Sequence, residues 1–213
     1  MTWTSAFGRG CGVLLDAIVG WLALTRINPN VLTALGLVIN VIAAFLFGYA
    51  TAETQRRMFF YAGLVIIGSG FFDLVDGRVA RARNKVTRFG GFFDSVVDRY
   101  SDASQFLGLL VFYARGERFS YVLLTAFVMI SAIMVSYTRA RAESLIGSCR
   151  VGFMERPERL VLVIIGALFN RMAPALWVIA VLSTITVIHR TVHTWRQTQL
   201  MEAGELDTTI HAA

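Results

Sequence analysis

The chain has 213 residues, of which 56% are hydrophobic and 16% are charged, and its mean hydropathy is +0.61. This composition lies well outside that of a soluble domain, so the sequence predicts an all-α, polytopic membrane protein. The net charge of +6 is the kind of excess that membrane topology produces, so a nucleic-acid partner is not needed to explain it.

Residues 1–30 are apolar but are interrupted by four glycines and by Arg9 and Asp16. We expect an amphipathic helix that lies along the cytoplasmic interface at 13–25 and turns into the first span at 28–30. A cleaved signal peptide is the alternative. It fits poorly, because Asp16 interrupts the apolar region and no small-residue cleavage site follows.

Six nearly charge-free runs follow, and they predict six transmembrane helices within a domain at 31–196. About 20 helical residues cross the ~30 Å of hydrocarbon, and flanking Arg side chains can extend the shorter runs to the interface. The fifth run spans only if its helix begins near Pro157 and continues to Arg171. A polar, frayed tail is expected at 197–213. The six runs are 31–52, 58–72, 89–113, 119–138, 160–170 and 172–188.

Four carboxylates interrupt this apolar pattern, with Asp73 and Asp76 after the second run and Asp94 and Asp98 inside the third. Spacings of three and four residues place each pair on one helix face. An ionisable group at membrane depth costs from about 3 to more than about 10 kcal/mol and persists mainly where it has a partner. Like charges cannot partner one another, so a divalent cation held by carboxylate oxygens is the simplest compensation. Oxygen ligands favour Mg²⁺, Mn²⁺ or Ca²⁺ over Zn²⁺. A cation or proton transporter could use the same carboxylates.

Basic residues indicate the orientation. If the N-terminus is cytoplasmic, fourteen of the 20 Lys and Arg residues lie in cytoplasmic segments, five lie in the opposite turns, and Arg99 lies within a span. The positive-inside rule therefore predicts a multi-pass protein of the cytoplasmic membrane, with both termini and the mouth of the acidic site in the cytoplasm. Asp102 continues the spacing of Asp94 and Asp98, and we expect it to make a structural hydrogen bond near Ser101 or Arg99.

The acidic region reads Asp73, two residues, Asp76-Gly77, two residues, Ala80-Arg81, eight residues, Gly90, three residues, Asp94, three residues and Asp98. This pattern resembles the signature of the CDP-alcohol phosphotransferases, and every fixed position is present. The resemblance extends to the leading interfacial helix and the six spans. It implies that 31–196 is a catalytic domain, which moves a phosphatidyl group from CDP-diacylglycerol to a small polar alcohol and releases CMP. It also implies a homodimer.

The resemblance implies roles for individual residues. Asp73, Asp76, Asp94 and Asp98 would hold two divalent cations, Mg²⁺ or Mn²⁺, and Asp98 would also take the proton of the acceptor hydroxyl. Two cations bridged by carboxylates would neutralise the pyrophosphate and the leaving CMP oxygen. The small residues Gly77 and Ala80 would let the nucleotide approach the helix closely, and the guanidinium of Arg81 would bind a phosphate oxygen. A helix start explains Pro29 and Thr33 equally well. The predicted donor-binding residues are Asp76, Gly77, Ala80, Arg81, Pro29 and Thr33.

The acceptor is predicted from stretches 136–143 and 155–159, which look like those of bacterial phosphatidylinositol-phosphate synthases. Arg binds phosphate bidentately, so this resemblance implies a pocket for inositol 1-phosphate. The family usually has Lys at position 139, and glycerol 3-phosphate or another alcohol stays open as the acceptor. Alternatively, these Arg residues only obey the positive-inside rule and pair with Glu143, Glu155 and Glu158. The acceptor candidates are Ser136, Arg139, Arg156, Arg159 and Arg190.

Overall fold

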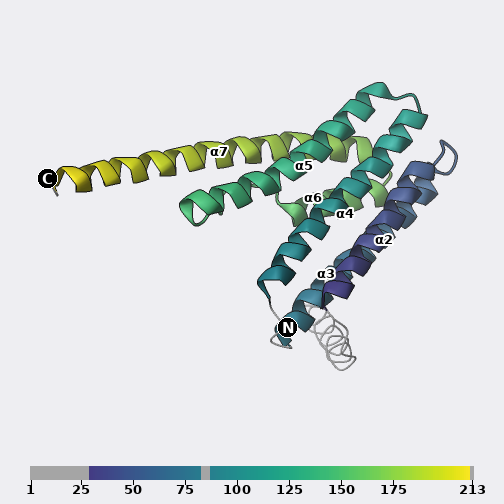
Figure 1. Ribbon diagram of the computed structural model, residues 1–213. Coiled ribbons are helices and arrows are strands. Elements are labelled where there is room, and N and C mark those ends of the chain that lie inside the picture. The colour runs from purple at the N-terminus through teal and green to yellow at the C-terminus, as the bar shows by residue number, and fades with distance from the viewer. Residues whose placement is uncertain (1–28, 83–86, 212–213) are drawn as a thin grey trace, which may run out of the picture.

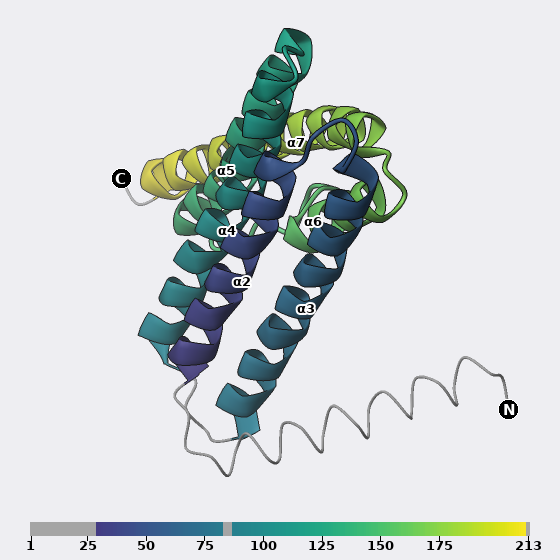
Figure 2. The ribbon, with the colours of Figure 1, turned by 90° about the vertical axis from the view of Figure 1, so that its right-hand side faces the viewer.

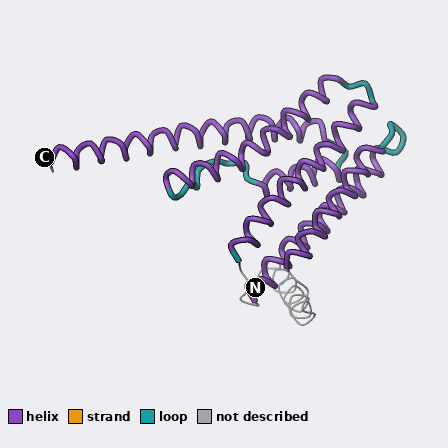
Figure 3. The backbone as a smooth tube through the Cα atoms, viewed as in Figure 1, coloured by secondary structure: helices purple, strands orange, loops and turns teal. Residues whose placement is uncertain are grey.

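The computed structural model describes the backbone of residues 29–82 and 87–211, and the side chains of residues 30–71 and 87–203 (Figure 1). All regular structure in these ranges is α-helical (Figure 3). The expected interfacial helix at 13–25 lies outside the described residues. The six described helices are α2 (Pro29–Tyr49), α3 (Gln55–Ala82), α4 (Arg88–Arg115), α5 (Phe119–Ile146), α6 (Arg156–Leu168) and α7 (Met172–His211).

Helices α2, α3 and α4 pack side by side, with α2 in contact with both of the others (Figure 2). The chain runs up α2, returns down α3 and rises again in α4. The first turns of α2 and α4 therefore lie at the same end of the bundle as the last turns of α3 (Figure 2). Helix α5 packs on α4 and α7, and short α6 packs on α3 and α7. This arrangement gathers the acidic motif at one end.

A glycine allows α2 and α4 to approach each other closely. A Cβ atom placed on Gly108 would lie 2.2 Å from the carbonyl oxygen of Ala44. Real atoms do not approach so closely, so any larger residue would force the two helices apart. Small residues commonly permit such contacts between membrane helices.

The apolar core includes an aromatic cluster at the end of the bundle opposite the acidic motif. The Phe59 ring meets Phe47 edge-on at 5.0 Å and Phe112 at 4.9 Å between ring centroids. Phe47 and Phe59 are fully buried, and Phe112 is 8% exposed. Aromatic pairs in this geometry add stability beyond the area that they bury. The cluster therefore fixes one end of α2, α3 and α4 and leaves the other end to polar groups.

Three of the described helices are long and apolar enough to cross a membrane: Asn30–Tyr49, Phe119–Ile146 and Met172–Ala203. The prediction of a polytopic membrane protein with six spans is therefore confirmed only for its helical class and for these three helices. Helix α6 has 13 residues and is about 20 Å long at 1.5 Å per residue. It ends at Leu168, before the Arg171 that a span required.

Three helices extend well beyond the predicted runs, among them α5, which continues eight residues past position 138 to Ile146. Helix α3 continues ten residues past position 72, through the acidic motif to Ala82. Helix α7 continues to His211, so the polar tail predicted from residue 197 is helical as far as residue 211. Polar residues of good helix propensity, among them Gln197, Gln199 and Glu202, sustain a helix without an apolar face.

Candidate active site

The carboxylates of the motif lie at the shared end of α3 and α4. Asp73 and Asp76 belong to the last turns of α3, and their side chains lie outside the described residues. Asp94 is exposed on α4, and the Asp98 side chain, one turn later, is 20% exposed. Among the described side chains no group of three or more His, Cys, Asp or Glu residues gathers. The four-carboxylate metal site therefore stays a prediction.

The proposed donor-binding residues belong to the same end of the bundle. Pro29 is the first residue of α2, and Thr33, one turn later, is 5% exposed. Gly77, Ala80 and Arg81 belong to the last turns of α3, where the side chains are not described. Thr87 caps α4, and its Oγ1 accepts a hydrogen bond of 2.9 Å from the Gly90 backbone N–H. The backbone therefore places both segments that the sequence assigned to the donor, the first turns of α2 and the last turns of α3, at the end of the bundle where α4 begins.

Ion pairs join α4 to α6. Arg156 Nη1 lies 2.9 Å from Asp98 Oδ1, and Arg156 Nε lies 3.8 Å from Asp102 Oδ1. Arg159 Nη2 donates to Asp102 Oδ2. The prediction that Asp102 has a structural partner is right, but Ser101 and Arg99 were the wrong partners. Arg99 instead donates to the Ser95 carbonyl oxygen, within its own helix. Two acceptor candidates thus contact two carboxylates of α4.

Arg159 is the more buried of the two α6 arginines, with only 2% of its side chain exposed, against 10% for Asp102. Within the described residues, its Nε and Nη1 atoms are buried and have no hydrogen-bond acceptor. A buried guanidinium is costly unless a counter-charge and hydrogen bonds compensate it. Asp102 therefore supplies the electrostatic compensation for Arg159.

A second ion-pair cluster centres on Glu155, just before α6. Glu155 Oε1 accepts from Arg139 Nη1 at 2.8 Å and from Arg190 Nη2 at 3.0 Å. Arg139 also pairs with Glu143 at 3.0 Å. The alternative that the arginines pair with nearby acids is therefore confirmed for Glu143 and Glu155. Glu158 instead accepts a 3.0 Å hydrogen bond from the Glu155 backbone N–H.

Arg190 is held rigidly between α5 and the loop before α6. Its side chain is 1% exposed, and it donates to the carbonyl oxygens of Val135 at 2.5 Å and Val151 at 2.8 Å. Ser136, next to Val135 in α5, is half-buried, and its hydroxyl lies 3.5 Å from the Ala132 carbonyl oxygen. Arg190, Ser136 and Arg139 thus belong to one region, and their role as acceptor contacts stays a prediction.

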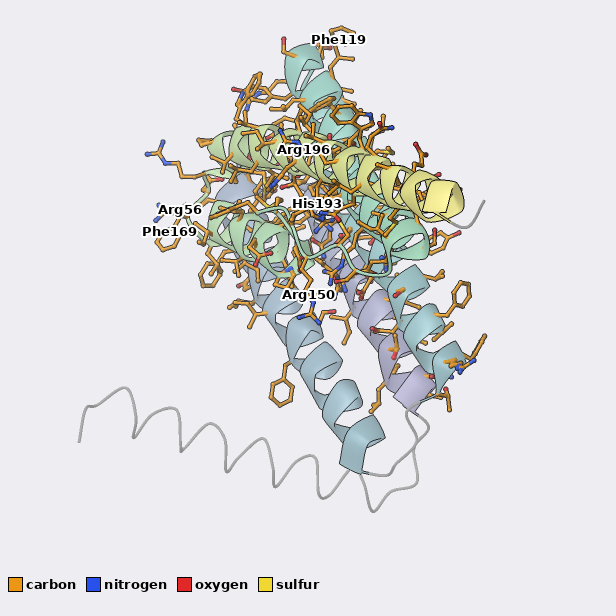
Figure 4. All side chains as sticks on the ribbon, turned by 90° about the vertical axis from the view of Figure 1, so that its left-hand side faces the viewer. Arg56, Phe119, Arg150, Phe169, His193 and Arg196 are labelled. Atoms are coloured by element: carbon orange, nitrogen blue, oxygen red, sulfur yellow. The ribbon has the colours of Figure 1, made fainter. Side chains whose placement is uncertain are left out.

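The loop at 147–155 is fixed against α7. Thr186 Oγ1 accepts from the backbone N–H groups of Phe153 at 3.2 Å and Met154 at 2.9 Å. Gly152 has φ +111°, and a Cβ atom there would lie 2.6 Å from Thr186 Cγ2. These contacts position Glu155 between two arginines. Figure 4 shows further basic side chains on this side of the molecule, including Arg150 of the loop and Arg196 of α7.

Two cavities near these elements differ in character. One of about 270 Å³ lies between α5 and α7, and Arg141, Arg190 and Thr194 are among its lining residues. The other, of about 520 Å³, is an apolar groove between α2 and α4 at Val41, Phe45 and Val111. Basic, hydroxyl and apolar side chains together line the first cavity.

Sequence reasoning named Glu155 as a partner of the arginines and Asp102 as a structural residue, but it did not identify which arginines each of them joins. Glu155 bridges two acceptor candidates, and Asp102 holds a third. The signal for Asp102 was its four-residue spacing from Asp98, which places both carboxylates on one face of α4. Spacing gave no signal for which arginines Glu155 contacts, because its partners are 16 and 35 residues away along the chain.

Comparisons with known proteins identify the proteins that this chain resembles in sequence and fold. The model of the CDP-alcohol phosphatidyltransferase family matches residues 26–195. An archaetidylinositol phosphate synthase of Pyrococcus horikoshii is 38% identical over 177 residues, which are 83% of this chain and 88% of that protein. The crystal structure of the Mycobacterium tuberculosis phosphatidylinositol phosphate synthase with CDP-DAG bound has 32% identity and a TM-score of 0.76, over 85% of this chain and 93% of that one. Its complex with manganese and citrate has 32% identity and a TM-score of 0.75, over 85% and 88%.

Proposed function

The chain belongs to the CDP-alcohol phosphatidyltransferase family, and from that premise we propose that it transfers a phosphatidyl group from CDP-diacylglycerol to inositol 1-phosphate and releases CMP. The names of its relatives support this acceptor, since they are synthases of inositol phosphate lipids. The observation that carries the proposal is the chain of ion pairs from Asp98 through Arg156 and Asp102 to Arg159. It joins a motif carboxylate to the arginines assigned to the acceptor.

The donor end would hold two divalent cations, Mg²⁺ or Mn²⁺. Asp94 and Asp98 offer carboxylate oxygens one turn apart on α4, both at least partly exposed, at the end where α3 carries Asp73 and Asp76. This set of carboxylate ligands fits a hard cation. A manganese complex of the solved relative supports a divalent metal. When bound, such cations neutralise the pyrophosphate and the oxygen of the leaving CMP.

Asp98 is the proposed general base. Its carboxylate would take the proton of the acceptor hydroxyl as that oxygen attacks the phosphorus of the donor. Arg156, at 2.9 Å from Asp98, would fix the carboxylate's orientation. Asp76, Gly77, Ala80, Arg81, Pro29 and Thr33 are the proposed contacts of the CDP-lipid.

The acceptor phosphate is assigned to the arginine region. Arg139, Arg190 and Glu155 form one cluster, and Arg156 and Arg159 form the other. Acidic partners hold these guanidinium groups in place before a ligand arrives, which lowers the ordering cost of binding. A guanidinium in a fixed orientation can bind phosphate bidentately. Ser136 would contribute a hydroxyl to the same pocket.

The membrane arrangement extends the proposal. We infer six spans, with the site and both termini on the cytoplasmic side of the inner membrane, and a homodimer. Three apolar helices support membrane insertion. Large apolar side chains such as Val38 and Trp177 are more than half exposed on the outer faces of α2 and α7, where lipid rather than water would cover them.

The test is CMP release by the purified protein in mixed micelles that contain CDP-diacylglycerol and Mg²⁺. Inositol 1-phosphate, inositol, glycerol 3-phosphate and serine are offered in parallel. We expect release that requires inositol 1-phosphate, and Arg139→Lys should keep that preference because it preserves the positive charge. Release only with glycerol 3-phosphate would overturn the acceptor and keep the reaction. No CMP with any acceptor, together with an ion flux in liposomes that Asp98→Asn abolishes, would favour a transporter.

A further inference from the structure

Three buried polar side chains connect α2, α3 and α4 inside the bundle. Asn40 Nδ2 donates to Ser69 Oγ at 2.6 Å, and Gln105 Nε2 donates to Asn40 Oδ1 at 2.6 Å. Asn40 Nδ2 and Ser69 Oγ both also donate to the Gly36 carbonyl oxygen, at 3.0 and 3.1 Å. Each of the three side chains is 2% exposed. One hydrogen-bonded group therefore ties together all three helices that carry the proposed metal ligands and donor-binding residues.

The position of this group along the helices is its most informative property. Counted toward the site, seven residues separate Asn40 from Thr33, Ser69 from Asp76, and Gln105 from Asp98. Seven residues are two helical turns, about 10.5 Å, and return to nearly the same helix face. Thr33, Asp76 and Asp98 are thus at about the same distance from the group on three different helices.

Apolar packing alone does not explain that coincidence. In a membrane, apolar helices gain little from burial against one another, so several axial positions have similar energies. A hydrogen-bonded polar group at the contact is satisfied at only one of them, in the same way that a buried Asn sets the register of a coiled coil. Sliding α3 by one turn would move Ser69 by about 5.4 Å and break both of its hydrogen bonds.

We propose that Asn40, Ser69 and Gln105 form a positioning triad, which sets the axial register of α2, α3 and α4 and so brings Thr33, Asp76 and Asp98 to one level at the metal and nucleotide site. This inference rests on the proposed function. The triad acts through the helices and touches neither metal nor substrate. Its loss should weaken metal binding more than an equal loss of stability from elsewhere in the core.

The test compares Gln105→Leu with Leu109→Ala. Leu109 is fully buried one turn farther from the site on the same helix, so its truncation disturbs the α4 core without touching the triad. Binding of Mn²⁺ to each purified protein is measured from the EPR signal of free Mn²⁺, and thermal unfolding is recorded in the same detergent. We expect Gln105→Leu to raise the Kd for Mn²⁺ about tenfold, the lower end of what loss of supporting groups costs a metal site. Leu109→Ala should leave that Kd unchanged.

Ser69→Ala is the second variant and is used if Gln105→Leu does not fold, because it removes only one hydroxyl. It should also raise the Kd. An unchanged Kd in the folded triad variants, or the same rise in Leu109→Ala, would overturn the positioning role while wild-type binding and CMP release left the proposed function intact. Failure of the wild-type protein to bind Mn²⁺ would instead overturn the proposed metal site and the triad's role with it.

Discussion

Asp102→Asn tests whether Asp102 compensates a buried guanidinium. The substitution keeps the shape of the side chain and removes its charge. Arg159 then keeps its charge with 2% of its side chain exposed, and Arg156 lies 3.8 Å from the position that was Asp102 Oδ1. Removal of one partner from a buried ion pair costs about 3–5 kcal/mol. The amide oxygen still accepts a hydrogen bond, so we expect the lower end, about 3 kcal/mol.

The assay is reversible unfolding of the purified protein by increasing SDS in mixed micelles. Glu143→Gln is the matched control, because it also turns an Arg-paired acid into an amide. The Arg139–Glu143 pair is 39% and 40% exposed and joins residues four apart on one helix. Such a pair contributes at most about 0.5 kcal/mol. Asp102→Asn should therefore be far more destabilising than its control.

A double variant separates charge compensation from packing. Asp102→Leu combined with Arg159→Met removes both charges, and replacement of a buried ion pair by apolar residues is often neutral or stabilising. We expect its stability to return to within about 1 kcal/mol of wild type. Its acceptor-dependent turnover should be lost, because Arg159 is one of the proposed acceptor contacts. Equal destabilisation by Asp102→Asn and Glu143→Gln, or a double variant less stable than Asp102→Asn, would refute the reasoning.

Three further predictions follow from the site and the packing. Asp98→Asn should leave a folded, monodisperse protein in detergent but slow CMP release by about 10²–10⁴-fold, as loss of a general base does; turnover near wild type would contradict the assigned role. Removal of divalent cations with EDTA should abolish CMP release, and added Mn²⁺ or Mg²⁺ should restore it; release that persists in EDTA would exclude the metal site. Gly108→Ala should cost about 1–3 kcal/mol in the SDS assay through overpacking, because its Cβ would meet the Ala44 carbonyl oxygen at 2.2 Å; unchanged stability would show that α2 and α4 adjust to the added methyl group.

The sequence predicted where helices begin better than where they end. Runs of apolar residues located all six described helices, and α5 and α7 begin at Phe119 and Met172 as expected. The same criterion ended α3 at position 72, because charged residues end an apolar run. They do not end a helix. No proline interrupts residues 73–82, so backbone hydrogen bonding continues through the motif.

The residues of the proposed site were easier to predict than the ion pairs that join them. Fixed spacing identified Asp94 and Asp98 because a helix converts spacing into a shared face. The partners of Asp102 depended on where the start of α6 lies relative to α4, because side chains 57 positions apart meet there. Local periodicity carries no information about such a contact. The positions of Arg156 and Arg159, three residues apart on α6, indicated only that both face the same way.

The central claim is that α3 and α4 together hold the divalent cations of a phosphatidyl transfer site. Anomalous diffraction from crystals grown with Mn²⁺ and CDP-diacylglycerol tests it most directly. We predict peaks between the last turns of α3 and the first turns of α4, with carboxylate oxygens of Asp73, Asp76, Asp94 and Asp98 at about 2.0–2.6 Å, the range of hard divalent cations. Peaks away from these four residues, or none in crystals that contain the bound nucleotide, would contradict it.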